Sequence, residues 1–243
     1  YRVSMPERLP QRIAWAGMPD VVLHAQISVV KQHQGYEAAK SGDAIAAHEL
    51  VLDCVSEEAV SSMLAWEGAS RPVLSPVHAL EDTGVNAIPL ALAEELAVRL
   101  GWDVETSVVQ GNLVGHTGAS GFRRLARQAL FVGDVTTGAS YVLVDDFIGQ
   151  GGTLANQRGH LIGGGACIIG ATVLTGKLHS TKLALAPSTL QDLRRKHGPE
   201  LEAWWQGRFG HAFDCLTESE ARYLIRTPDA DRVRDRIAQE EQG

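Results

Sequence analysis

Cysteine is scarce in this sequence, with three residues among 243: Cys54, Cys167 and Cys215. They have no short metal-binding spacing, and their odd number favours a reducing compartment over a disulfide scaffold. Long apolar runs are also missing, because the longest weakly polar stretch, 161–176, is shorter than the ~20 residues that cross a bilayer. No basic segment followed by an apolar run marks a signal peptide. We therefore expect a cytoplasmic protein without a membrane partner.

Positive charge is also in short supply. The chain has 22 Lys and Arg against 29 Asp and Glu, which gives a formal net charge of −7. This balance argues against nonspecific nucleic-acid binding through bulk charge. The apolar share of 44% and the charged share of 21% are near the globular averages and exclude collagen and wholesale disorder. A chain of this length is expected to form one or two domains with a full core.

The first 70 residues are expected to form a helical extension without a chemical motif. Residues 1–35 read as an irregular arm, 36–52 as helix with a break at 41–43, and 56–66 as a short helix that begins at Ser56. Their simplest role is to cover the core or to contact a second copy in a homodimer.

From residue 71 to 178 apolar runs alternate with helical patterns. Strands are expected at 71–77, 104–109, 141–144 and 167–174, and helices at 88–100, before Gly101, and at 153–162. Apolar strands without strict alternation, separated by helices, indicate an α/β fold with a mostly parallel sheet flanked by helices.

The tail, 179–243, is expected to be helical. The spacing at Ser188 and at Thr217 predicts two capping boxes, Gly198 predicts a helix end, and Thr227 before Pro228 predicts a helix start.

The segment 141–153, Tyr-Val-Leu-Val-Asp-Asp-Phe-Ile-Gly-Gln-Gly-Gly-Thr, carries the chemistry. An apolar strand delivers Asp145 and Asp146 to its carboxyl end, where ligands bind in open parallel sheets. The glycines that follow let the backbone approach a ligand, and successive amides at a helix start favour a phosphate. A sugar phosphate would suit both parts of the segment, with its hydroxyls at the aspartates and its phosphate at the glycines. The alternative is a plain corner whose aspartates only cap the helix. A Walker-type loop is excluded because no lysine follows the glycines, and a dinucleotide fingerprint because the acids come first.

Residues 141–153 resemble the phosphoribosyl-pyrophosphate (PRPP) signature of type I phosphoribosyltransferases: four apolar residues, two acids, a variable stretch and Gly-Gly-Thr. Over about 70–178 the order of elements is most similar to the competence protein F branch. In that branch a Pro-rich strand end matches 75–78, an Arg-Gly-Phe-Asn loop matches 83–86, and a loop with Thr, Gln and Arg matches 116–127. The resemblance implies a type I phosphoribosyltransferase-like core with helical additions at both ends.

The resemblance also implies roles for single residues. Asp145 and Asp146 would be the catalytic pair that holds the ribose 2- and 3-hydroxyls, partly through Mg2+. The 5-phosphate would be bound by Gly149, Gln150, Gly151, Gly152 and Thr153. Lys177, just after the strand at 167–174, is a further candidate phosphate contact.

Pyrophosphate would lie between the loop 78–84 and a mobile flap, 110–127. The candidate contacts there are His78, His116, Arg123, Arg124 and Arg127. Positive charge and a metal beside the leaving group would lower the barrier, and closure would exclude water. The alternative is a helix whose arginines only face solvent.

Three departures from the family pattern narrow the function. Gly149 stands where hypoxanthine-guanine enzymes have an acid, which disfavours a 6-oxopurine substrate. No lysine lies between Gly101 and Lys177, so a lysine-based flap is missing. Thr83 replaces the arginine of the competence-branch loop.

We expect an enzyme that binds PRPP with Mg2+ and transfers phosphoribosyl to a nitrogen nucleophile with release of pyrophosphate. The alternatives are a catalytically silent PRPP or nucleotide sensor or accessory protein of DNA uptake or defence, and a hydrolase of ribosyl phosphates. The acceptor stays open. Trp204 and Trp205 are candidates for base stacking, but neighbours on a helix face different ways, so we expect one of them in the core.

Overall fold

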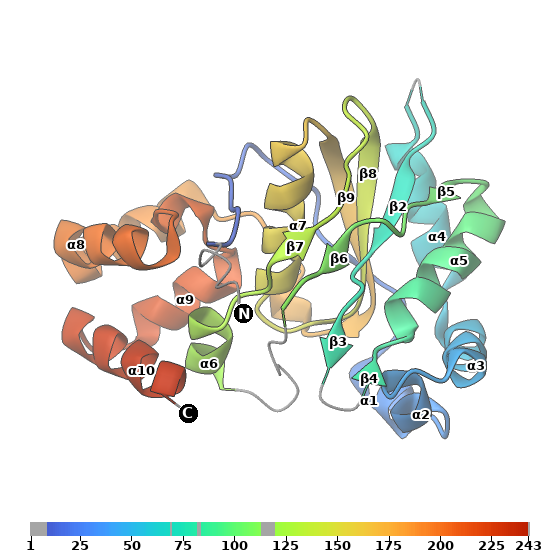
Figure 1. The fold of residues 1–243 in the computed structure, drawn as a ribbon, viewed down its shortest axis with the longest axis horizontal. Coiled ribbons are helices and arrows are strands. Elements are labelled where there is room, and N and C mark those ends of the chain that lie inside the picture. Colours follow the sequence, from blue (N-terminus) through green and yellow to red (C-terminus); the bar gives the residue numbers. More distant parts are fainter. Residues whose placement is uncertain (1–8, 69, 82–83, 113–119, 243) are drawn as a thin grey trace, which may run out of the picture.

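The computed structural model describes residues 9–68, 70–81, 84–112 and 120–242. Its centre is a five-stranded sheet in the order β1 (Val22–Leu23), β9 (Cys167–Gly176), β8 (Ser140–Ile148), β2 (Val73–Pro76) and β5 (Asp103–Val104), and all neighbouring strands are parallel. Helices lie on both faces of the sheet (Figure 1). The expected α/β architecture with a mostly parallel sheet is confirmed.

The two faces of the sheet are covered by different helices. Val142 and Val144 of β8 pack in one core with α3 (Ala44–Cys54), α4 (Glu57–Met63) and α5 (Ile88–Leu100). Leu143, between them in sequence, packs in a second core with α7 (Gly152–Gly163). Successive side chains of a strand point to opposite faces, so the continuous apolar run of β8 serves both cores.

The first 70 residues take part in this sheet. The prediction of an irregular arm over 1–35 is wrong for 22–32, where β1 pairs with β9 and α1 (Ile27–Gln32) follows. A two-residue strand is too short to show alternation in a sequence. The break at 41–43 is confirmed: α2 (Tyr36–Lys40) ends there, and the carboxylate of Asp43 accepts the amides of Ile45 and Ala46 at the start of α3. Ser56 caps α4, as expected, and a 3-10 turn, η1 (Leu64–Trp66), extends it.

The predicted strand 104–109 is wrong. β5 ends at Val104, and β6 (Val109–Gln110) belongs to a separate antiparallel pair with β7 (Phe131–Val132). The chain turns between them because the amide of Ser107 donates to the carboxylate of Glu105 at 2.6 Å. The excursion 111–130 therefore leaves and returns through β6 and β7, and it carries α6 (Gly121–Ala126). A second small pair, β3 (Leu80–Glu81) and β4 (Gly84–Val85), follows β2.

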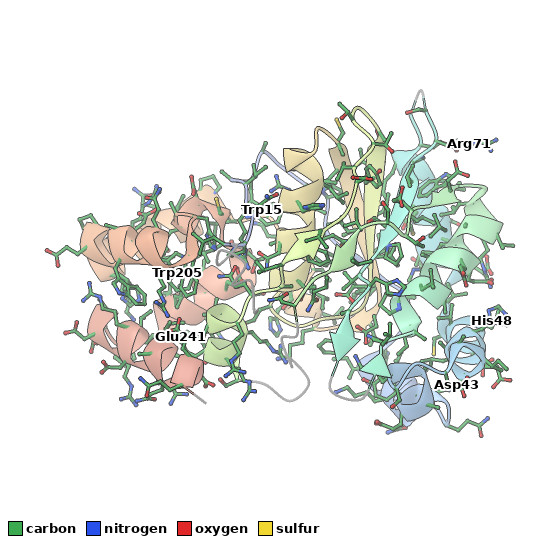
Figure 2. The ribbon with its side chains drawn as sticks, in the orientation of Figure 1. Trp15, Asp43, His48, Arg71, Trp205 and Glu241 are labelled. Carbon is green, nitrogen blue, oxygen red and sulfur yellow. The ribbon has the colours of Figure 1, made fainter. Side chains whose placement is uncertain are left out.

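The tail forms a helical layer beside the sheet, drawn in orange and red at the left of Figure 1. Its helices are α8 (Pro187–Phe209), α9 (Glu218–Arg226) and α10 (Ala230–Gln242), with short turns η2 (Leu178–Ser180) and η3 (Phe213–Cys215). Trp205 is fully buried among them, and α6 joins this core through Phe122 and Leu125. Figure 2 labels Trp205 inside this layer. Trp204 is only half-buried, so the expectation of one core tryptophan is confirmed.

The predicted ends of the tail helices are partly right. The capping box of Thr217 and Glu220 is confirmed, and Gly198, at φ 74°, interrupts α8 before Pro199. The capping box at Ser188 is wrong, because α8 already begins at Pro187. α10 begins at Ala230 rather than at Pro228. Its first amides are capped by Asp229, which accepts from Arg232. No helix in the described ranges has the length and apolarity for a membrane crossing.

Candidate functional site

A cleft of about 190 Å³ opens at the carboxyl end of β8. From β2 the chain runs through α5 to β5 on one side, whereas from β8 it runs through α7 to β9 on the other side. Such a switch in direction leaves a crevice between the two strands, which is where ligands bind in open parallel sheets. Residues 145–154 line the cleft, together with Val77 and Ala79 after β2.

The two aspartates lie inside the strand rather than after it. The prediction that the strand ends at Val144 is wrong, because β9 keeps pairing with β8 as far as Ile148. β2 stops pairing at Val144, so Asp145 and Asp146 pass beyond its end and face the crevice. Both are nearly buried, at 7% and 8% exposure.

The carboxyl groups of the pair lie close to each other. The amide of Asp146 donates to the carboxylate of Asp145 at 2.8 Å, and the two side chains also share a hydrogen bond. Burial, and next the negative charge of Asp146, raise the pKa of Asp145 well above its usual range. Two such carboxyl groups can bind hydroxyl groups or a cation, either of which would reduce the repulsion between them.

A lysine from the N-terminal helices faces the second aspartate. The Nζ of Lys40, the last residue of α2, lies 3.0 Å from an Oδ of Asp146. Their side chains are 13% and 11% exposed. Nearby, the Nζ of Lys31 lies 5.5 Å above the ring of Phe147. Sequence reasoning missed both lysines, since nothing in α1 or α2 forms a motif; only the lack of lysine in the predicted flap hinted that a cation had to come from elsewhere.

The glycine turn after β8 lines the cleft. Gly151 caps α7 at φ 80°, a left-handed conformation that favours glycine. The carbonyls of Gly149 and Gln150 accept the hydroxyls of Ser180, at 2.5 Å, and of Thr217, at 2.6 Å. Within the described ranges, no acceptor meets the amides of residues 151–153. Amides at the start of a helix, at the positive end of its dipole, are donors of the kind that can bind an anion.

A buried ion pair closes one side of the turn. Arg12, from the N-terminal arm, forms a bidentate pair with Glu220 of α9, at 2.5 and 2.9 Å, and the two side chains are 1% and 2% exposed. Arg12 also donates to the side chain of Asn156 in α7 at 2.7 Å. Burial alone would raise the pKa of Glu220, but the charge and hydrogen bonds of Arg12 outweigh it and lower that pKa. Both residues line the cleft, and neither was predicted.

Part of the predicted flap packs against the tail. The ring of Phe122 lies 5.1 Å from that of Tyr223, and the hydroxyl of Ser120 donates to Glu240 at 2.6 Å. The Nη1 of Arg124 lies 2.2 Å from where a Cβ on Gly149 would stand, so its guanidinium fills the space that a side chain there would need. Burial lowers the pKa of Arg124 from its usual value. In its described part, the flap is anchored to α9 and α10.

The predicted residues fall into two groups. Those that line the cleft are Arg124, Asp145, Asp146, Gly149, Gln150, Gly151, Gly152 and Thr153. His78, Arg123, Arg127 and Lys177 do not line it, and Lys177 is exposed. His116 and Thr83 lie outside the described residues. Neither Trp204 nor Trp205 reaches the cleft.

Comparison with known proteins finds two curated relatives. The Escherichia coli protein named "Protein TraN" is 39% identical over 228 residues, which are 94% of this chain and 51% of the relative. A Haemophilus influenzae protein described as "Uncharacterized protein" is 35% identical over 161 residues, 66% of this chain and 36% of the relative. The chain thus spans about half the length of the first and about a third of the second. No protein-family model matches it.

Proposed function

We propose that this cleft binds PRPP and that the chain transfers its phosphoribosyl group to a nitrogen nucleophile. The observation that carries the proposal is that two buried carboxyl groups and a glycine turn line one cleft at the switch point of a parallel sheet. All of them belong to a single strand-turn-helix corner. The type I phosphoribosyltransferase-like fold is part of the proposal. It is supported by the order of the strands and by the excursion between β6 and β7.

Different parts of this strand-turn-helix corner can bind the two ends of a sugar phosphate. The amides of residues 151–153 and the hydroxyl of Thr153 would bind the 5-phosphate, because a helix start favours a doubly charged anion. Asp145 and Asp146 would accept hydrogen bonds from the ribose 2- and 3-hydroxyls, which replace the strained contact between the two carboxyl groups. Arg124 and Lys40 add positive charge within the same cleft.

The donor set fits Mg2+ only together with a substrate. In the described part of the chain, no group of three or more His, Cys, Asp or Glu side chains could hold a metal ion by itself. Mg2+ is commonly bound through one or two carboxylates plus substrate phosphates. Asp145 and Asp146 would supply those carboxylates, and the metal would neutralise charge on the departing pyrophosphate.

In the proposed reaction the acceptor nitrogen forms a bond to C1 of the ribose. The bond between C1 and the pyrophosphate oxygen breaks with both electrons on oxygen, and the proton that the nitrogen loses passes to solvent. A positively charged and closed cleft favours this step, because the sugar becomes cationic and water would intercept it. The names of the two relatives state no ligand or reaction, so the acceptor has to be found by screening.

The test is a calorimetric titration of PRPP with Mg2+, followed by a screen of nucleobases for pyrophosphate release. Asp146→Asn should weaken PRPP binding at least tenfold, while Asp103→Asn, at an exposed position on the edge strand β5, should leave it unchanged. Unaltered affinity in the Asp146 variant would remove the proposal.

The same experiment separates the alternatives. Release that requires a base supports transfer. Release without any base identifies a hydrolase, and binding without release identifies a silent sensor on the same fold.

A further inference from the structure

The cleft obtains its lysines from outside the α/β core. Between Gly101 and Lys177 the core contains none, although a pyrophosphate leaving group calls for positive charge. Lys40 enters the cleft from the end of α2 instead. Its neighbour Ala39 is fully buried, and the carbonyl of Ala39 accepts the amide of Ala87 at 3.1 Å just before α5. The backbone that carries Lys40 is therefore fixed to the core.

One partner of Lys40 is a residue of the proposed sugar site. Its Nζ lies 3.0 Å from an Oδ of Asp146, and both side chains are almost removed from solvent. Such a pair gains little net stability, because the cost of desolvating two charges roughly offsets their attraction. In this arrangement the ammonium compensates part of the negative charge of the two aspartates.

We infer that Lys40 is an exchangeable cation: it neutralises Asp146 in the empty cleft and binds a pyrophosphate oxygen when the cleft is filled. The inference rests on the proposed function. A lysine ammonium is a point charge on a flexible four-carbon stem, so it can turn between two anionic partners without movement of the backbone. Asp146 would also be a ligand for a divalent cation bound with the substrate, and Lys40 would then be left to bind the leaving group.

Four proteins test the inference: the wild type, Lys40→Met, Asp146→Asn and the double variant. The probe is inorganic pyrophosphate without divalent metal, followed by calorimetry, so that only the anion is measured. Lys40→Met should weaken pyrophosphate binding at least tenfold. Asp146→Asn should tighten it, about threefold or more, because it removes one anionic partner of the ammonium and a carboxylate that repels the anion. The double variant should lose that gain and bind at least tenfold more weakly than Asp146→Asn.

The decisive comparison is Asp146→Asn against the double variant. A lysine that served only as a structural partner of Asp146 would have no further role once that carboxylate is gone, so equal affinities would overturn the inference. The comparison also survives poor folding of Lys40→Met, which leaves a buried carboxylate without its partner, because neither of the two proteins compared contains that charge. Thermal denaturation of all four confirms that each is folded.

Lys31→Met is the matched control. Lys31 lines the same cleft, but its Nζ lies over the ring of Phe147, and in the described part of the chain it forms no ion pair with either aspartate. Its removal should change pyrophosphate affinity less than threefold. An equal loss in both lysine variants would show a diffuse charge effect and would overturn the specific role. A wild type that binds pyrophosphate but not PRPP would refute the proposed function and leave Lys40 standing. If the wild type binds PRPP but Lys40→Met leaves pyrophosphate affinity unchanged, the proposed function stands and the role of Lys40 is refuted.

Discussion

Substitution of Gly151 by alanine tests the glycine turn most directly. At φ 80° an alanine costs about 1–2 kcal/mol in backbone strain alone. Its Cβ would also stand 2.3 Å from a methyl carbon of Leu183, which is 1% exposed and packs in a hydrophobic core. Overpacking of this kind costs about 1–3 kcal/mol more. The free energy of unfolding should therefore fall by about 2–5 kcal/mol, and the melting temperature by about 2–4 °C per kcal/mol.

Gly138→Ala provides the matched control. Gly138 has nearly the same φ, 79°, but nothing lies within 4 Å of an added Cβ, and it precedes the opposite end of β8. It should lose only the strain part, about 1–2 kcal/mol. Calorimetry with PRPP and Mg2+ should show at least a tenfold loss of affinity for Gly151→Ala and none for Gly138→Ala. Equal melting temperatures and equal affinities in the two variants would refute the steric and functional reasoning together.

Three further predictions follow from buried polar groups. Thr217→Val should weaken PRPP binding at least tenfold, because the carbonyl of Gln150 loses the hydroxyl that donates to it, and Thr217→Ser should restore the affinity. Thr227→Val removes a similar hydroxyl contact at the other end of α9. It should lower stability but leave the PRPP affinity unchanged in the same calorimetric assay. Asp145→Asn should raise the free energy of unfolding at pH 7 by about 0.5–2 kcal/mol. The raised pKa of Asp145 makes its ionisation costly in the folded state, so wild-type stability falls as the pH rises above about 4, and urea denaturation should show the variant's gain disappearing below that pH. Burial lowers the pKa of His24 to about 4, so between pH 6.5 and 4 the unfolded chain binds a proton that the folded chain does not. The free energy of unfolding should therefore fall over that range, by about 1.4 kcal/mol per pH unit and up to about 3 kcal/mol in all. In His24→Gln, urea denaturation at a series of pH values should show a smaller fall.

Local patterns in the sequence predicted those parts of the fold that are set by neighbouring residues. Gly101 ends α5 at φ 70°, and Thr217 with Glu220 forms a capping box, because both motifs act within one helical turn. Ser188 has the same spacing but does not cap. The helix had already started one residue earlier at Pro187, where the carboxylate of Glu218 accepts the amide of Ala186. A tertiary contact thus replaced the local cap.

The same distinction divides the candidate site. Asp145, Asp146 and the glycine turn lie in one strand-turn-helix corner, so their order along the chain determined that they would meet. Lys40 and Arg12 reach that corner from 106 and 140 residues away. No periodicity or spacing could assign them, because their positions depend on how α2 and the N-terminal arm pack against the sheet.

The predicted flap arginines show the limit of reasoning from charge alone. Arg123, Arg124 and Arg127 were equivalent in the sequence, but α6 packs Phe122 and Leu125 into the core of the tail, and this fixes which side of the helix meets the cleft. Only Arg124 is then placed against Gly149, where the absence of a Cβ gives its guanidinium room. Gly149 thus admits an arginine at a position where a side chain on the turn would exclude it.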